Sequence, residues 1–138
     1  PLVKALSQLF ADGSGVGQVS KLYADSFSQI QSVNNDIDLN PGPNGAFGAV
    51  PFATLKGIIV FAGALNPGNL IVGNVTNGIV GPFGAATHSQ AVKPGGVYVN
   101  LAPDAAGFTV TAGTADLLRI ASSANAGTYT GDVILIGT

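Results

Sequence analysis

From residue 21 onward, apolar and polar positions alternate in short segments, the pattern of β-strands that bury one face. In the segment 96–102, for example, Val97, Val99 and Leu101 alternate with Tyr98 and Asn100. Clusters of Gly, Pro and Asn separate these segments and predict turns. Eight or nine strands at this spacing predict an all-β sandwich or barrel. The segments predicted as strands are 21–31, 33–39, 52–62, 69–76, 88–93, 96–102, 107–112, 116–122 and 128–136.

Two of these segments are apolar at every position instead of alternating. They are Ile58-Ile59-Val60-Phe61 and Val133-Ile134-Leu135-Ile136. A strand that is apolar on both faces lies in the centre of a sheet, or its outer face is covered by a partner. We therefore expect both segments to be central strands or part of an interface.

The N-terminal segment has a different pattern. Leu2, Leu6, Leu9 and Phe10 follow a partial helical spacing, but a helix of three turns at most is not stable alone and needs a surface to lie on. The glycines that follow, in 13–17, predict a flexible linker. We therefore divide the chain into an arm and Gly-rich linker, residues 1–20, and a single β-sandwich domain, residues 21–138. The alternative is a frayed terminus that packs on its own domain.

Composition adds a reason to expect an interface. The 138 residues suit one domain, and the chain has no Cys, Met or Trp and no long helical pattern, which excludes helical bundles, disulfide scaffolds and thiolate metal sites. Charged residues make up 9%, against about 25% in typical domains. So few charges leave much neutral and apolar surface, and such surface usually marks contact with another protein.

The charges also argue against two classes of partner. The five cations, Lys4, Lys21, Lys56, Lys93 and Arg119, are scattered, and the sequence pI is 4.8, so we expect no nucleic-acid binding. The best apolar run, 57–65, is far shorter than the roughly 20 residues of a spanning helix, so we expect no membrane partner. No signal peptide is visible, and we expect synthesis in a cytoplasm.

No residue pattern points to catalysis. His88 is the sole histidine, and a relay built on it would need Asp104, Asp116 or Asp132 as its acid, yet no nucleophile motif accompanies it. An exposed loop or edge-strand histidine is the favoured interpretation. The absence of Glu and Trp likewise argues against glycoside hydrolysis. We predict no catalytic residue and no cofactor.

One segment resembles half of a metal site. Asp36 and Asp38 are spaced as in the first part of a calcium loop, but Pro41 replaces the required glycine and Phe47 stands where the bidentate acid belongs. We therefore expect both acids to face solvent while the apolar residues beside them point inward. A weak cation site is the alternative.

Several further segments resemble a known family, the capsid cement (decoration) proteins of tailed bacteriophages, and its podoviral members in particular. The resemblance spans nearly the whole chain, and its motifs are turns and strands, not a catalytic signature. The segments that carry it are Pro94-Gly95-Gly96, Ala102-Pro103-Asp104, the run from Gly107 to Ile120, Asp132 to Gly137, Ala11 to Gly15, and Asp36 to Leu39.

The resemblance implies a jelly-roll β-sandwich that binds the outside of an HK97-like phage head as a homodimer and cements neighbouring major capsid proteins. It implies a virion protein with no catalytic residue. A trimer is the alternative assembly. The residues that we expect at partner interfaces are Leu2, Leu6, Leu9, Phe10, Phe47 and Phe83.

Two other functions compete with this one. A tail or fibre head domain that binds a host-surface glycan would show an exposed aromatic groove, for which Tyr23, Tyr98 and Tyr129 are the candidates. An enzyme that depends on His88 is the least favoured. Hundreds of copies per virion would indicate a shell protein, and a few to dozens would indicate a tail protein.

Overall fold

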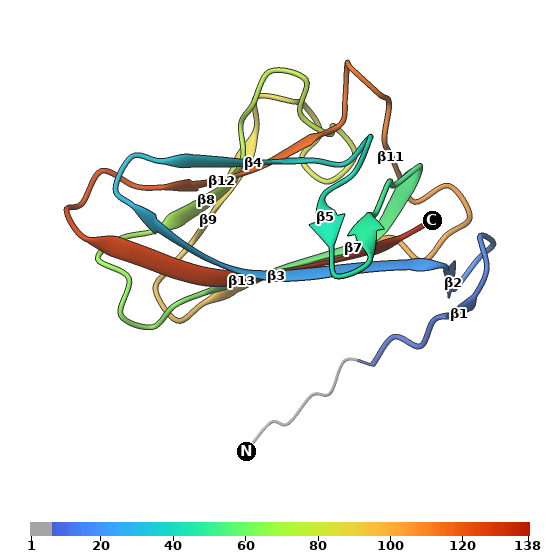
Figure 1. Ribbon diagram of the computed structural model, residues 1–138, viewed down its shortest axis with the longest axis horizontal. Coiled ribbons are helices and arrows are strands. Elements are labelled where there is room, and N and C mark those ends of the chain that lie inside the picture. The colour runs from blue at the N-terminus through green and yellow to red at the C-terminus, as the bar shows by residue number, and fades with distance from the viewer. Residues whose placement is uncertain (1–6) are drawn as a thin grey trace.

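The computed structural model describes residues 7–138, which form two packed β-sheets and, within that range, no helix (Figure 1). The predicted β-sandwich is therefore confirmed. The larger sheet has the strand order β10-β7-β13-β3, with β11 also paired to β7, and the smaller has the order β4-β12-β8-β9. The strands of the larger sheet are β3 (Lys21–Ile30), β7 (Thr54–Ala62), β10 (Val97–Leu101), β11 (Phe108–Thr109) and β13 (Thr128–Gly137). Those of the smaller are β4 (Asn34–Asp38), β8 (Leu70–Gly73), β9 (Ser89–Val92) and β12 (Leu117–Ser122).

The core lies between the two sheets, where the inward positions of the alternating strands meet. In β13, Val133 and Leu135 are almost completely buried, while the alternate residues Ile134 and Ile136 point to the other face. Residues from both sheets contribute bulk, as two-layer packing requires. The largest fully buried apolar side chains are Tyr129, Phe52, Leu39, Leu55, Ile58, Leu70, Ile79, Leu118, Ile120 and Leu135.

Each of the nine predicted segments contains a strand, and all the pairings in the two sheets are antiparallel. The segment 107–112 is shortened to β11, because a turn closed by the Thr111–Ala115 bridge follows directly. Four two-residue strands were not predicted from the sequence, since they are too short to show alternation. They are β1 (Ala11–Asp12), β2 (Gln18–Val19), β5 (Asn44–Gly45) and β6 (Gly48–Ala49).

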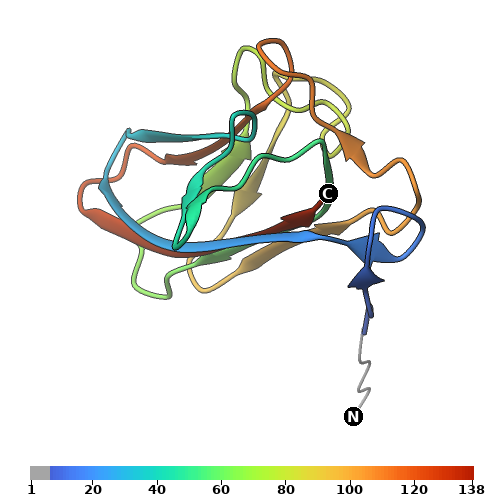
Figure 2. The same ribbon diagram turned by 45° about the vertical axis from the view of Figure 1, so that its right-hand side comes forward.

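The Gly-rich segment forms a loop between the short strands β1 and β2. β1 and β2 pair in parallel, and the Gln18 side chain accepts a hydrogen bond from the Gly15 N–H at 2.8 Å. The Gly17 N–H donates to the Pro103 carbonyl at 2.7 Å, which ties the loop to the body. Residues 7–10 form no helix, and Leu2 and Leu6 lie outside the described residues. Figures 1 and 2 show residues 7–10 leaving β1 on the outer side of the larger sheet.

Candidate functional site: an apolar sheet face

The outer face of the larger sheet is apolar and no part of the described chain covers it. The strand registers place side chains in three rows across β10, β7, β13 and β3. The middle row is entirely apolar, and the other rows add a single charge, Asp132. The rows are Val97-Phe61-Asp132-Ser26, Val99-Ile59-Ile134-Ala24 and Leu101-Gly57-Ile136-Leu22.

The exposure of these side chains is high for apolar residues in the middle of strands. Leu22 is 64% exposed, Val97 52%, Val99 46% and Phe61 43%. Ile59, Ile134 and Ile136 are half-buried by their neighbours in the sheet. A contiguous apolar face of this kind usually marks contact with another protein. We refer to it below as the apolar face.

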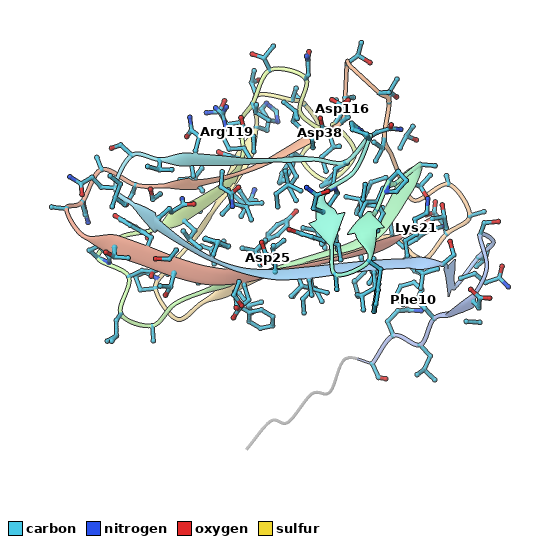
Figure 3. All side chains as sticks on the ribbon, in the orientation of Figure 1. Phe10, Lys21, Asp25, Asp38, Asp116 and Arg119 are labelled. Carbon is cyan, nitrogen blue, oxygen red and sulfur yellow. The ribbon has the colours of Figure 1, made fainter. Side chains whose placement is uncertain are left out.

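The outer face of the smaller sheet carries more charge than the apolar face, because Asp36, Asp38 and Arg119 lie on it beside apolar residues such as Ile71. Arg119 of β12 donates from Nε and Nη2 to the two carboxylate oxygens of Asp36 in β4, at 2.6 and 2.7 Å. This ion pair holds the pKa of Asp36 below its usual value, mainly through the hydrogen bonds from the guanidinium. Arg119 and Asp38 lie on the opposite side of the molecule from Phe10 (Figure 3).

The prediction for the segment resembling a calcium loop is confirmed. Asp36 and Asp38 are exposed, while Ile37 and Leu39 are buried in the core. Arg119 occupies both oxygens of Asp36, a partner that sequence spacing could not reveal. Within residues 7–138, no three His, Cys, Asp or Glu side chains are grouped so that they could hold a metal ion.

Lys56 reduces the surface charge further, because it is completely buried. Its Nζ donates to the backbone carbonyls of Asp104 and Ala105. The register of β7 against β13 shifts here, since Gly137 pairs with Leu55 while Ile136 pairs with Gly57. The extra residue in β7 is Lys56, and its side chain extends beneath the loop between β10 and β11. This cation is therefore structural and is not available to a partner.

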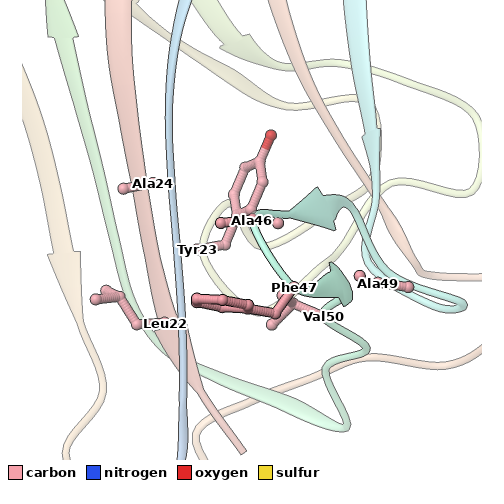
Figure 4. A pocket seen from close by; sticks show the side chains of 9 residues that line it. Leu22, Tyr23, Ala24, Ala46, Phe47, Ala49 and Val50 are labelled. Atoms are coloured by element: carbon pink, nitrogen blue, oxygen red, sulfur yellow. The ribbon is translucent and has the colours of Figure 1, made fainter.

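A second apolar feature adjoins the apolar face at the edge of the sheet. The hairpin β5–β6 carries Phe47 at its tip, where the ring is fully exposed. The hairpin and β3 enclose a pocket of about 370 Å³, lined by Leu22, Tyr23, Ala24 and residues 45–50. Figure 4 shows the Phe47 ring beside β3, next to Leu22. Apolar surface thus continues from the sheet face around the edge of β3.

The predicted interface residues are only partly in exposed positions. Leu9 is 86% exposed and Phe47 is fully exposed, whereas Phe10 is half-buried. Phe83 packs on the core instead, with its ring stacked on Tyr98 at a centroid distance of 6.1 Å. None of the residues of the apolar face is among these six predicted interface residues. The signal was present in the two segments that are apolar at every position, 58–61 and 133–136.

The residues on which the two alternative functions depend are the three tyrosines of the glycan hypothesis and His88 of the enzyme hypothesis. Tyr129 is fully buried, Tyr23 is nearly so, and Tyr98 packs beneath Phe83, so these tyrosines do not form the exposed groove that the glycan hypothesis needs. His88 is exposed, and its Nδ1 lies 3.1 Å from the Phe83 carbonyl oxygen.

Comparisons with known proteins assign no family to this chain. No protein-family model, no curated protein and no solved structure matches it. Among the residues that the structure describes, no helix is long and apolar enough to cross a membrane.

Proposed function

We propose that this protein is a structural virion protein that binds the outside of a phage head and cements neighbouring major capsid proteins. The observation that carries the proposal is the apolar face. The segment 133–136 of β13 is apolar on both sides although the described residues cover only one of them. Such a protein is built to be held in an assembly, where other protein covers the second side.

The free energy gained by burying the apolar face favours an assembly with several contacts over a single weak contact. Complete burial of an exposed Val, Leu, Ile or Phe side chain contributes about 1.5–3 kcal/mol. Four side chains of the apolar face are about half exposed and the others less, so the face supplies on the order of 4–8 kcal/mol. Association costs an estimated 4–15 kcal/mol in lost freedom. The face alone gives modest affinity, and linked contacts multiply it. This supports self-association as a homodimer, with a trimer as the alternative.

The strand order supports a jelly roll as the finer description of the fold. Eight strands form the sandwich when the short β11 is set aside, and their pairings are nested: β3 with β13, β4 with β12, β7 with β10, and β8 with β9. A long antiparallel hairpin wrapped into two sheets produces this nesting, which is the jelly-roll arrangement. The same architecture is what the resemblance to cement proteins implies.

The proposal is tested on phage heads assembled without this protein. We expect Val97→Thr/Val99→Thr, which keeps the shape and β-propensity of both side chains, to reduce the number of copies bound per head at a fixed concentration. The matched control is Ile71→Thr on the outer face of the smaller sheet. Quantitative gel analysis of purified heads gives the copy number. Unsubstituted protein that does not bind such heads, or binding that both substitutions reduce equally, would refute the proposal.

A further inference from the structure

Strand β3 is a long border strand, and within residues 7–138 no other strand pairs with its outer edge. It has ten residues, whereas the border strands β4, β9 and β10 have four or five. Proteins usually protect such an edge with Pro, with a Lys in mid-strand or by keeping the strand short. β3 has none of these protections, since its only Lys is its first residue and its only other charge is Asp25.

The hydrogen-bond pattern fixes which main-chain groups of β3 point to the open edge. In β13 the Thr130 carbonyl accepts from the Gly63 N–H at 2.9 Å, so the main-chain groups of Thr130 face the β7 side. Even-numbered residues of β13 therefore bond to β7 and odd-numbered residues bond to β3. The register then directs the N–H and C=O groups of alternate β3 residues away from β13, namely those of Leu22, Ala24, Ser26 and Ser28.

The hairpin β5–β6 makes part of this edge one wall of an apolar slot. The hairpin pairs with no strand of either sheet, and it faces Leu22 and Ala24 across the pocket of about 370 Å³. Phe47 and Val50 line the opposite wall, and the Phe47 ring lies next to Leu22 (Figure 4). An occupant of the slot therefore meets main-chain donors and acceptors on one side and apolar side chains on the other.

An acidic hollow lies beside the slot on the outer face of the sheet. It has a volume of about 480 Å³, and Ala24, Ser26 and Asp132 are among the residues that line it. Asp132 accepts a hydrogen bond from the Ser26 hydroxyl at 2.5 Å, and no cation in the described part of the chain forms a salt bridge with it. Because Ala24 and Ser26 are small, a long side chain that starts beside Ser26 can lie across them and reach the carboxylate.

We propose that the open edge of β3 binds an extended segment of another protein, which adds a strand to the sheet and carries apolar residues beside Leu22 and Ala24 and an Arg or Lys beside Ser26. Main-chain hydrogen bonds to the edge supply affinity, and the alternate side chains supply specificity. The three side chains lie on one face of the segment, since residues i, i+2 and i+4 of a strand share a face. This site is separate from the apolar face and does not depend on the proposed function.

Amide hydrogen exchange followed by NMR tests the proposal on the isolated protein. The probe is a fluorescently labelled peptide of about nine residues that alternates Val with Thr and has Arg in place of the central Val, so its pattern is the same in both directions. We expect the amides of Leu22, Ala24 and Ser28 to exchange rapidly in the free protein and at least about tenfold more slowly with saturating peptide. The amides of Tyr23 and Phe27, which bond to β13, should exchange slowly in both states.

A proline substitution tests the edge itself. Ala24→Pro removes an edge N–H without removing a bond to β13, and we expect it to weaken peptide binding at least about tenfold in fluorescence anisotropy. The matched control is Val99→Pro on the open edge of β10, for which we expect unchanged binding. The bond from the Ala62 N–H to the Gly96 carbonyl shows that odd-numbered residues of β10 point away from β7.

Charge reversal tests the acidic hollow. Asp132→Lys should weaken binding of the Arg peptide, and we expect this variant to prefer a peptide with Glu in place of the Arg by at least about fivefold. Asp132 lies on the outer face, away from the core, so the substitution leaves the strand pairing in place. Equal affinity of the variant for the two peptides would remove Asp132 from the site.

Four results would overturn the inference as a whole. The first is no binding of the Arg peptide at concentrations up to about 1 mM. The second is binding that Ala24→Pro and Val99→Pro weaken equally. The third is slow exchange of the edge amides at every protein concentration without peptide, because the chain then covers its own edge. The fourth is protection that rises with protein concentration, because a second copy then takes the edge. None of these measurements uses phage heads, so failure here leaves the proposed function standing, and the reverse also holds.

Discussion

Two adjacent residues of β13 allow a direct measurement of which face is the core and which is an interface. Leu135 and Ile134 lie on opposite sides of the strand, and replacing either by Ala removes the same number of carbon atoms. Leu135 is completely buried and lies beside Tyr23 of β3 and Ile58 of β7, both core residues. Ile134 is half-buried on the apolar face beside Ile59 and Ala24. The two substitutions should therefore affect different properties.

The expected magnitudes follow from burial. Leu135→Ala loses about 2.4 kcal/mol of transfer free energy at about 0.8 kcal/mol per methylene, and the cavity left in the core raises the loss to about 3–4 kcal/mol. For a domain of this size, that lowers the melting temperature by roughly 10–15 °C. Ile134→Ala loses a smaller transfer term and some β-propensity, together about 1–1.5 kcal/mol in the isolated subunit.

The assay is urea unfolding followed by circular dichroism, at several protein concentrations. At concentrations where the subunit is monomeric, we expect Leu135→Ala to destabilise it by about 1.5–3 kcal/mol more than Ile134→Ala. Association stabilises the folded state in a concentration-dependent way, and Ile134→Ala should remove that dependence while Leu135→Ala retains it. Equal losses in the monomer would show that the chain covers its own apolar face, and the interface argument would then be wrong.

Three further outcomes are expected. Asp36→Asn should lower the free energy of unfolding by less than about 1 kcal/mol at pH 7, and this difference should vanish near pH 2. The ion pair lowers the pKa of Asp36 in the folded state. Its contribution to stability is therefore present above the unfolded pKa of about 3.9 and is lost as the pH falls through the lower folded value. Urea unfolding at the two pH values measures this, and a difference that persists at low pH would contradict the assignment to ionisation. Gly73→Ala should destabilise the protein by about 1–3 kcal/mol more than Gly113→Ala. An added Cβ at Gly73 would lie 2.5 Å from the His88 carbonyl oxygen, whereas at Gly113 it meets nothing within 4 Å. Equal melting temperatures of the two variants would show that the His88 segment moves freely. His88→Ala should leave the melting temperature and the number of copies bound per head unchanged, and loss of binding with the fold intact would assign His88 a role that its exposed position does not suggest.

Much of the sandwich could be predicted from local pattern alone. Alternation gave the positions of the long strands, because the side-chain period of a strand is two and one face of each is buried. The segments 58–61 and 133–136, apolar at every position, indicated central strands with a second face to cover. The low charge content indicated an interface but could not locate it.

Tertiary structure decided which residues share a surface. The three rows of the apolar face join strands that lie far apart in the sequence, and the Asp36–Arg119 pair spans 83 positions. The burial of Lys56 depends on a shift of register between β7 and β13, which no local pattern records. Periodicity specifies the face on which a side chain lies, whereas strand order and register depend on long-range packing and loop closure. For that reason the sequence alone indicated that the second face of these strands needed a partner. Only the fold showed that the apolar face is one continuous surface with Asp132 as its single charge.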